Sequence, residues 1–457
     1  MRRSSAALLA ACCLAAAQTP DRQLARDIFK QLIEIDTTDS AGDNTRAAEA
    51  MAARFRDAGF PQNDIHVLAP AARKGNLVVR LRGTGSARPI LFNGHLDVVE
   101  AKRSDWSLDP FQFREQDGYF YGRGTSDMKG DDAVLVATFL RLKAEGFRPA
   151  RDMILALTSD EEGGNFNGVD WLLKNHRDLV DAEYCVNSDS GGGHIKNGRR
   201  LFMSVQAAEK VYLTFRLEAT NPGGHSSLPA KDNAIYHLAD GLSRLGKFDF
   251  PVHLFDVTRA YFERVAPLYG GQLGADLNAI VANPNESAAA GRLSELPYYN
   301  ALLRTTCVAT MLSGGHAENA LPQTARATVN CRLLPVELAE DVERTLRGVL
   351  ADSAIRVSAM RPPKTGRFTP PSEDVMKVVT AATEKVWPGI RVVPVMETGA
   401  TDGVYWRAAG IPMYGISGIF TDEDDVRAHG RDERVLVRSF EDALDFMYVV
   451  CRRLGAQ

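Results

Sequence analysis

The sequence predicts an α/β protein in which a large domain with a mostly parallel sheet is interrupted by a smaller α+β, ferredoxin-like domain. Two observations carry this prediction. Continuous apolar strands alternate with helical segments up to about residue 187 and again after about residue 370, which is the pattern of a sheet buried on both faces. Between these regions, strands alternate apolar and polar residues, which indicates a sheet with one exposed face.

The first part of the large domain, named the catalytic domain from the site residues described below, is expected over residues 18–206. Apolar residues at helical spacing predict helices, and short continuous apolar runs bounded by polar turns predict strands. The predicted helices cover about 21–36, 45–58, 131–145 and 167–175, and the predicted strands cover 76–81, 89–93, 153–157 and 184–187.

The lid/dimerisation domain is expected over residues 207–360, and the second part of the catalytic domain over 361–457. The lid has the element order of a split βαβ unit. Its strands are predicted at 211–217, about 303–311, 324–333 and 354–359, and its helices at about 232–245 and 336–351.

An insertion without clear periodicity occupies about residues 251–300 of the lid. Its aromatic residues could form an apolar substrate wall, a larger dimer contact, or the ordinary core of an inserted helix pair. They are Phe255, Tyr261, Phe262, Tyr269, Tyr298 and Tyr299.

The N-terminus has the features of a secretory signal peptide. Two arginines precede the apolar stretch from Ala6 to Ala17, and small residues stand before Gln18, as in a charged region, an apolar region and a cleavage site. The stretch is shorter than the roughly 20 residues that span a bilayer. We therefore expect residues 1–17 to be removed and the protein to be secreted or periplasmic. A frayed Ala-rich helix is one alternative, and a lipoprotein anchored through Cys12 is another.

The overall composition is that of an ordinary globular protein. The chain has 457 residues, 45% of them hydrophobic and 25% charged, and a formal net charge of −4. The absence of a long basic run argues against nucleic acid or an anionic membrane as the main partner. No segment after the signal is long and apolar enough to span a membrane.

Four cysteines remain after the signal, and their scattered spacing does not resemble a metal site. Cys185 and Cys451 are isolated in the sequence. Cys307 and Cys331 could pair in an exported protein if their strands are neighbours, which the sequence alone leaves open.

Side chains able to bind metal ions lie at four separate strand ends or loops. Taken singly, they are more simply a loop histidine, charged turn residues or turn formers. Ligands of open α/β sheets bind at the carboxyl ends of strands, so these side chains should converge on one crevice. Carboxylates packed there would repel unless cations compensate, and a carboxylate-bridged metal pair recurs in hydrolases. The candidates are His95, Asp97, Asp127, Glu161, Glu162 and Asp189.

A series of motifs accompanies these candidates: Gly94-His-Leu-Asp-Val98, Trp106, Asp109-Pro-Phe111, Tyr121-Gly-Arg-Gly-Thr-Ser-Asp-Met-Lys-Gly130, Asp160-Glu-Glu-Gly-Gly164, Pro222-Gly-Gly-His-Ser226, Asn319-Ala-Leu-Pro322 and Ala428-His-Gly430. In this order, from about residue 25 to 450, the chain resembles the di-zinc aminoacylase/carboxypeptidase metallopeptidase family. That family includes succinyl-diaminopimelate desuccinylase, acetylornithine deacetylase, glutamate carboxypeptidase and carboxypeptidase S-like enzymes.

The resemblance implies two Zn²⁺ ions, with Co²⁺ or Mn²⁺ as alternatives. Asp127 would bridge both ions. His95 and Asp189 would complete one site, and Glu162 and His429 would complete the other. The aspartate at position 189 is commoner in the dipeptidase and carboxypeptidase S-like branches, which argues against a desuccinylase.

The resemblance also implies amide hydrolysis, with a bridging hydroxide as the nucleophile and Glu161 as the general base. The spacing of Asp97 suits a carboxylate that accepts the other ring N–H of His95 and fixes its tautomer.

Three lid residues receive roles from the resemblance. His225 would reach the active site of the partner subunit in a homodimer and stabilise the oxyanion. Arg332 would bind the free carboxylate of the substrate in a bidentate manner, and Asn319 would help to hold the same end. Without the resemblance, His225 would be a turn histidine and Arg332 a surface arginine at a strand end.

These predictions describe an exported enzyme that releases amino acids from short peptides or N-acyl amino acids. An aminopeptidase or dipeptidase on the same scaffold is an alternative, and it would need an anionic group near the free amine of the substrate. A non-catalytic binding protein on a hydrolase scaffold is a third hypothesis. Such proteins usually lose a ligand or the base, whereas this chain keeps all six positions.

Overall fold

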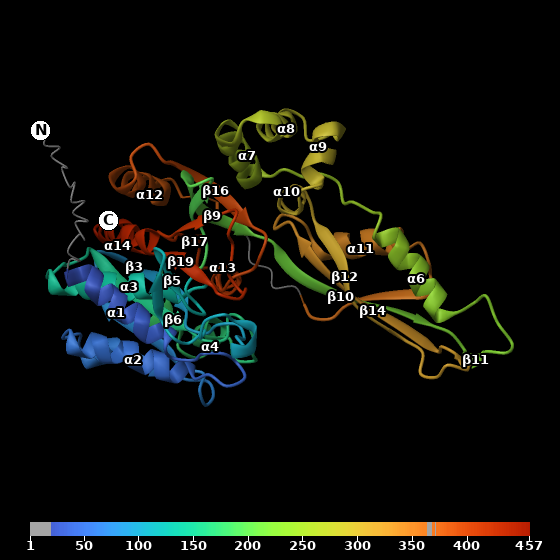
Figure 1. The fold of residues 1–457 in the computed structure, drawn as a ribbon, viewed down its shortest axis with the longest axis horizontal. Helices are drawn as coiled ribbons and strands as arrows, with labels where there is room; N and C mark the ends of the chain where they lie inside the picture. Colours follow the sequence, from blue (N-terminus) through green and yellow to red (C-terminus); the bar gives the residue numbers. More distant parts are fainter. Residues whose placement is uncertain (1–19, 363–367, 371) are drawn as a thin grey trace, which may run out of the picture.

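The computed structural model describes residues 20–362, 368–370 and 372–457, so the predicted signal peptide and Cys12 lie outside the described residues. A large α/β unit and a smaller elongated unit lie side by side (Figure 1). A large mixed sheet forms the first and a separate four-stranded sheet forms the second, which confirms the predicted fold class. No helix in the described ranges combines the length and apolar character that a membrane span requires.

The large unit is built around a ten-stranded sheet. In chain order its strands are β1 (Ile65–Leu68), β2 (Asn76–Leu81), β3 (Ala87–His95), β6 (Arg151–Thr158), β7 (Tyr184–Asn187), β8 (Gly192–Lys196), β9 (Arg199–Glu209), β16 (Arg391–Glu397), β17 (Met413–Gly415) and β18 (Phe420–Asp422). The spatial order is β1-β2-β6-β3-β7-β17-β9-β8-β18, with β16 also paired to β9. The central strands β6, β3, β7 and β17 are parallel, so their carboxyl ends meet at one edge.

Helices cover both faces of this sheet because its central strands are apolar on both sides. Along β6, Met153 and Leu155 join one core cluster, whereas Ile154 and Ala156 join another on the opposite face, as the strand alternation requires. The first face is covered by α1 (Pro20–Ile33), α2 (Asn44–Asp57), α3 (Lys129–Ala144), α12 (Glu373–Val386) and α14 (Val437–Gly455), and the second by α4 (Gly168–Asn175), α5 (Arg177–Val180) and α13 (Gly403–Ala408).

The small unit consists of an antiparallel sheet with two helices on one face. Its elements are β10 (Val211–Thr220), α6 (Ala234–Leu245), β12 (Thr306–Gly314), β14 (Thr324–Leu333), α11 (Ala339–Leu350) and β15 (Ile355–Ala359), with the strand order β12-β14-β10-β15. This is the predicted split βαβ arrangement. Buried residues of β10 and β14 pack against α6 and α11, while the other sheet face stays open. At the far end, β11 (Gly224–His225) pairs with β13 (Ala320–Leu321) (Figure 1).

A disulfide joins the edge strand of the small unit to its neighbour. Cys307 on β12 stands opposite Cys331 on β14, and the two sulfur atoms are bonded. The strands are therefore neighbours, and the pairing that the sequence left open does occur. Cys185 and Cys451 are buried free thiols.

The insertion folds mainly into four short helices and packs on the large unit. Its helices are α7 (Asp256–Tyr269), α8 (Gly271–Ala282), α9 (Ser287–Ser294) and α10 (Pro297–Leu303). They form one apolar cluster with Phe202 of β9 and Val393 of β16, so this part of the segment expected as lid contributes to the core of the catalytic sheet. Tyr261 is 2% exposed and Tyr299 is 7% exposed, which favours ordinary core packing over an open aromatic wall.

Candidate active site

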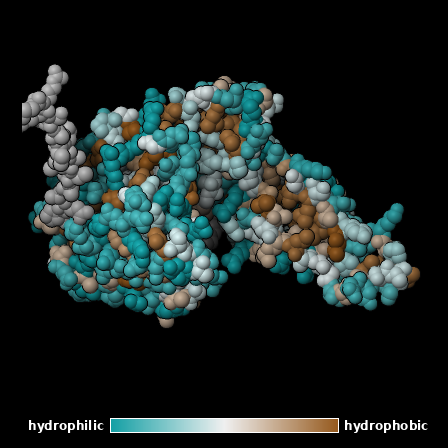
Figure 2. Space-filling view, in the orientation of Figure 1, coloured by the Kyte–Doolittle hydropathy of each residue, from teal (hydrophilic) through white to brown (hydrophobic). Residues whose placement is uncertain are grey.

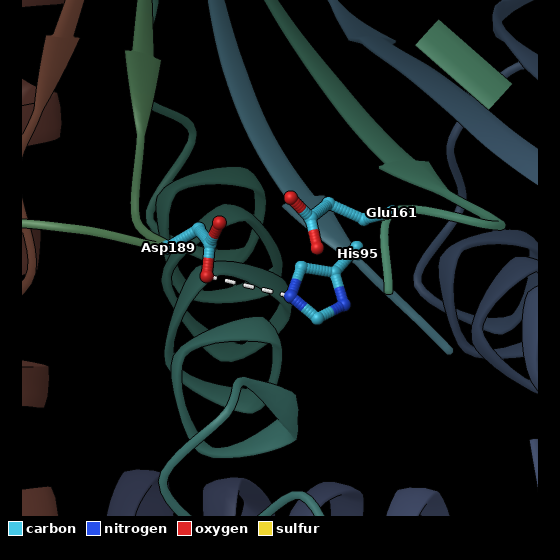
Figure 3. A group of neighbouring side chains, drawn as sticks. All are labelled: His95, Glu161 and Asp189. Atoms are coloured by element: carbon cyan, nitrogen blue, oxygen red, sulfur yellow. Dashed lines mark ion pairs between the residues drawn. The ribbon is translucent and has the colours of Figure 1, made fainter. Parts of the chain in front are cut away.

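The predicted ligands of the large unit converge at the carboxyl edge of the parallel strands. His95 ends β3, Glu161 and Glu162 follow β6, and Asp189 follows β7. His95, Glu161 and Asp189 point toward one another (Figure 3). One ligand atom from each of these three residues lies within 4.8 Å of the others, which is close enough for a shared ion.

The two histidines lie on opposite sides of Asp127. His95 Nε2 is 3.1 Å from Asp127 Oδ1 and 3.4 Å from Asp189 Oδ1. His429 Nε2 is 3.0 Å from Asp127 Oδ2 and 2.8 Å from Glu162 Oε1. Because each histidine faces a different oxygen of Asp127, this carboxylate occupies the place of a bridging ligand between two sites.

The positive groups of the protein do not fully offset the burial and mutual repulsion of the carboxylates in the site. Burial raises the pKa of Asp189 to about 7, although His95 opposes the rise. Burial and the Asp189 charge raise the pKa of Glu161 well above its ordinary value. Burial would also raise the pKa of Asp127, but hydrogen bonds from His429 and His95 outweigh it and lower the pKa. Two imidazoles and four carboxylates in one crevice are a donor set that suits a pair of divalent cations.

The structure corrects the expected role of Asp97. Its carboxylate Oδ1 is 3.7 Å from His95 Nδ1, which is too far for a hydrogen bond. The backbone carbonyl of Asp97 lies 3.0 Å from that nitrogen instead. The carboxylate accepts the backbone N–H groups of Glu161, at 3.2 Å, and Glu162, at 2.9 Å. Asp97 therefore orients His95 through its main-chain carbonyl. Its side chain orients the loop that carries Glu161 and Glu162.

Two further carboxylates stabilise the loop that carries Glu161 and Glu162. Asp160 pairs with the buried Lys74 at 2.6 Å and has a positive φ of 59°, a conformation that a non-glycine residue adopts only with support. Asp402 accepts hydrogen bonds from Thr158, at 3.1 Å, and Asn167, at 2.7 Å, on either side of the loop. Sequence reasoning assigned no role to Lys74 or Asp402. For Asp402, the available signal was its position between a threonine and a glycine in Thr401-Asp-Gly403.

The predicted lid residues do not join the metal site of their own chain. Arg332 pairs with Tyr212 where β14 ends and β10 begins, near the large unit, and its guanidinium lies over the Tyr212 ring at 4.6 Å. His225 lies in β11 at the opposite end of the small unit (Figure 1). Asn319 is beside His225, because its carbonyl accepts the N–H of Ser226 at 3.0 Å. Within one chain, Asn319 therefore does not lie with Arg332.

Comparisons with known proteins agree with this geometry. The profile described as peptidase family M20/M25/M40 matches residues 91–453. The human N-fatty-acyl-amino acid synthase/hydrolase PM20D1 is 28% identical over 380 residues, covering 79% of this chain and 73% of that protein. An M20 family metallo-carboxypeptidase of Sulfolobus solfataricus has a TM-score of 0.69 at 17% identity, covering 94% of this chain and 99% of that one.

A dinuclear metal-binding peptidase of the M20 family from Bacillus subtilis shares the fold with a TM-score of 0.59, at 11% identity, over 95% of this chain and 98% of that chain. The profile match spans most of the sequence and includes every residue of the metal crevice. The chain is thus a metal-dependent hydrolase of amide bonds that belongs to peptidase family M20/M25/M40.

Proposed function

We propose that the protein is an exported di-zinc hydrolase that releases amino acids from N-acyl amino acids or short peptides. The observation that carries the proposal is the Asp127 carboxylate held between His95 and His429, with Glu161 beside it. The relatives named for hydrolysis of N-fatty-acyl amino acids and for carboxypeptidase activity support the substrate class.

The proposed metal ligands form two sets that share Asp127. Asp127, His95 and Asp189 would hold one zinc ion, and Asp127, Glu162 and His429 the other. When bound, the ions supply Lewis acidity and activate water at neutral pH. Imidazole with carboxylate suits zinc, while cobalt and manganese fit the same donors.

Glu161 is the residue placed to move the proton. Its backbone is held by Asp97, and its carboxylate lies with His95 and Asp189 in the crevice. A raised pKa brings a carboxylate closer to the operating pH of a general base. Glu161 would take a proton from the attacking water and deliver it to the leaving amine.

Arg332 is the residue suited to the free carboxylate of the substrate. Arg332 forms no ion pair with an acidic side chain in the described ranges, and burial lowers the pKa of its guanidinium while Tyr212 opposes the fall. Stacking on Tyr212 leaves the edge of the guanidinium available, and that edge can bind a carboxylate through two hydrogen bonds. This favours an N-blocked amino acid or the C-terminal end of a peptide over a substrate recognised by its amine.

A homodimer would complete the site. His225 and Asn319 lie together at the end of the small unit that is remote from the metal crevice, so they can act on a substrate only in another copy. Apolar surface gathers on the small unit (Figure 2), and the edge strand β12 exposes Val308, Met311 and Leu312. An exposed apolar strand edge is suited to pairing with an identical edge.

Export is supported by the disulfide as well as by the N-terminal pattern. Cross-links between cysteines form and persist in oxidising compartments, and Cys307 is bonded to Cys331. We place the protein in the periplasm or outside the cell.

The test is a substrate panel with the Glu161→Gln variant. Zinc, cobalt or manganese enzyme should cleave N-acyl amino acids or C-terminal peptides faster than dipeptides with a free amine. Glu161→Gln should keep both metals and lose about 10²–10⁴-fold in kcat. Faster cleavage of free dipeptides would favour the dipeptidase alternative, and an active Glu161→Gln enzyme would remove Glu161 as the base.

A further inference from the structure

We propose that Glu433 and Arg123 form a clamp that sets Asp127 and His429 at their separation and thereby tunes the metal site that these two residues share with Glu162. The inference rests on the proposed function for the identity of the metal ions. It adds two positioning residues that neither touch the substrate nor bind a metal.

The Glu433 carboxylate is fully buried and accepts four hydrogen bonds from the loop that carries Asp127. Oε1 accepts the backbone N–H of Ser126 at 2.7 Å and of Asp127 at 3.1 Å. Oε2 accepts the N–H of Gly124 at 3.2 Å and Nη1 of Arg123 at 2.5 Å. Charge-assisted bonds to three backbone amides fix the main chain of the loop, and with it the origin of the bridging side chain.

Arg123 extends the clamp to the loop that carries His429. Its Nη2 lies 3.4 Å from the backbone carbonyls of both His429 and Glu100. The guanidinium also stacks over Trp106 at 5.0 Å, so the planar group is held from its face and its edges. His429 has a positive φ of 62°, which a non-glycine residue keeps only where surrounding contacts impose it.

The clamp lies between two strands that are already joined. In the three-stranded sheet β4 (Arg114–Gln116), β5 (Tyr119–Tyr121) and β19 (Arg434–Leu436), β19 pairs with β5. The N–H of Gly122 continues this pairing to the carbonyl of Glu433 at 3.2 Å.

Beyond that point the two segments of the chain diverge. One leads forward to Asp127 and the other leads back to His429. The side chains of Glu433 and Arg123 connect them where the backbone pairing stops. Outer partners that orient metal ligands typically contribute 10–100-fold to metal affinity.

The experiment is zinc titration of the metal-free full chain, with the absorption of bound Co²⁺ as a second reading. Glu433→Gln should bind the second zinc ion about 10–100-fold more weakly than the parent does, and the first, which shares only Asp127 with the clamp, should weaken less. Added zinc should restore kcat, which a purely structural lesion would not allow. The control is Asp276→Asn in α8, which also removes a buried carboxylate paired with an arginine, Arg292; it should keep both affinities.

A folded Glu433→Gln protein with two metals at parental affinity would overturn the clamp. If that variant does not fold, Arg123→Lys decides, because lysine keeps the charge but lacks the second nitrogen that reaches His429. Arg123→Lys should weaken the second site by about tenfold, and unchanged affinity would overturn the inference. A parent that binds two metals but cleaves no amide would sink the proposed function alone; a parent with one metal would sink both.

Discussion

The metal crevice and the small unit carry their functional side chains in opposite ways. In the crevice, ligands from five separate segments lie within hydrogen-bonding distance of a neighbour inside one chain, as His95, Asp127 and His429 show. In the small unit, Arg332 and His225 belong to one domain but lie at its two ends. The crevice therefore gathers its metal-binding side chains within one chain, whereas under the proposed function the substrate-binding side would be completed by a second copy. Changes in the crevice should affect metals and chemistry, and changes in the small unit should spare the metals.

The largest effect should follow from Asp127→Ala. Without the bridging carboxylate, His95 and His429 no longer share a partner, so both metal sites should weaken and activity should fall by at least about 10³-fold, or roughly 4 kcal/mol of transition-state stabilisation. Metal content per chain, measured by elemental analysis, checks this. His429→Ala is the matched comparison and should lose one metal; an Asp127→Ala protein with two tightly bound metals would refute the bridging role.

The next effect concerns His225, which should act across the subunit boundary. His225→Ala should keep both metals and lose about 10²–10³-fold in kcat, the usual cost of a missing oxyanion donor. Mixing it with Glu161→Gln should form hybrid dimers with one intact site, and random exchange should return about a quarter of the parental activity. Each variant alone serves as the control. A mixture no more active than its components would argue that His225 acts within its own chain or not at all.

A smaller effect is expected for Arg332→Leu. The loss of a charged hydrogen-bonding partner for the substrate carboxylate should cost about 1.5–3 kcal/mol, seen mainly as a higher KM, with metal content unchanged. Substrates whose carboxylate is converted to an amide should be cleaved equally by parent and variant. If the variant discriminated between acid and amide as strongly as the parent, the carboxylate would be bound elsewhere.

Part of the crevice could be predicted from position alone, because three of its ligands follow strands that are adjacent in the sheet, whereas His429 and the bridging role of Asp127 came from the family resemblance. His95, Glu162 and Asp189 each stand within a few residues of a predicted strand end. Because β6, β3 and β7 are adjacent in the sheet, these three residues lie close together in the fold. The actual contact of Asp97 escaped prediction, because the choice between its carbonyl and its carboxylate depends on less than 1 Å of backbone placement.

Contacts between remote segments were beyond sequence reasoning. Glu433 meets the Asp127 loop across 306 residues, and nothing in the local pattern distinguishes it from an exposed acidic turn residue. The helices of the insertion were not predicted for another reason. They are short and bury different faces against β9, β16 and one another, so no single amphipathic period extends along the segment. Asn319 was assigned to the end of the substrate that Arg332 binds, which one chain alone does not allow.

The smallest effect on activity should come from the disulfide, although its effect on the small unit should be clear. Cys307 and Cys331 are 24 residues apart in sequence, and a cross-link of that length stabilises by about 3.5 kcal/mol in the chain-entropy model. Reduction should therefore lower the thermal stability of the small unit and raise KM slightly, since Arg332 follows Cys331. Metal content should not change. A Cys307→Ala, Cys331→Ala protein, which should be indifferent to reductant, provides the control. If reduction released metal from the parent but not from this control, the crevice would depend on the small unit, and its independence would be disproved.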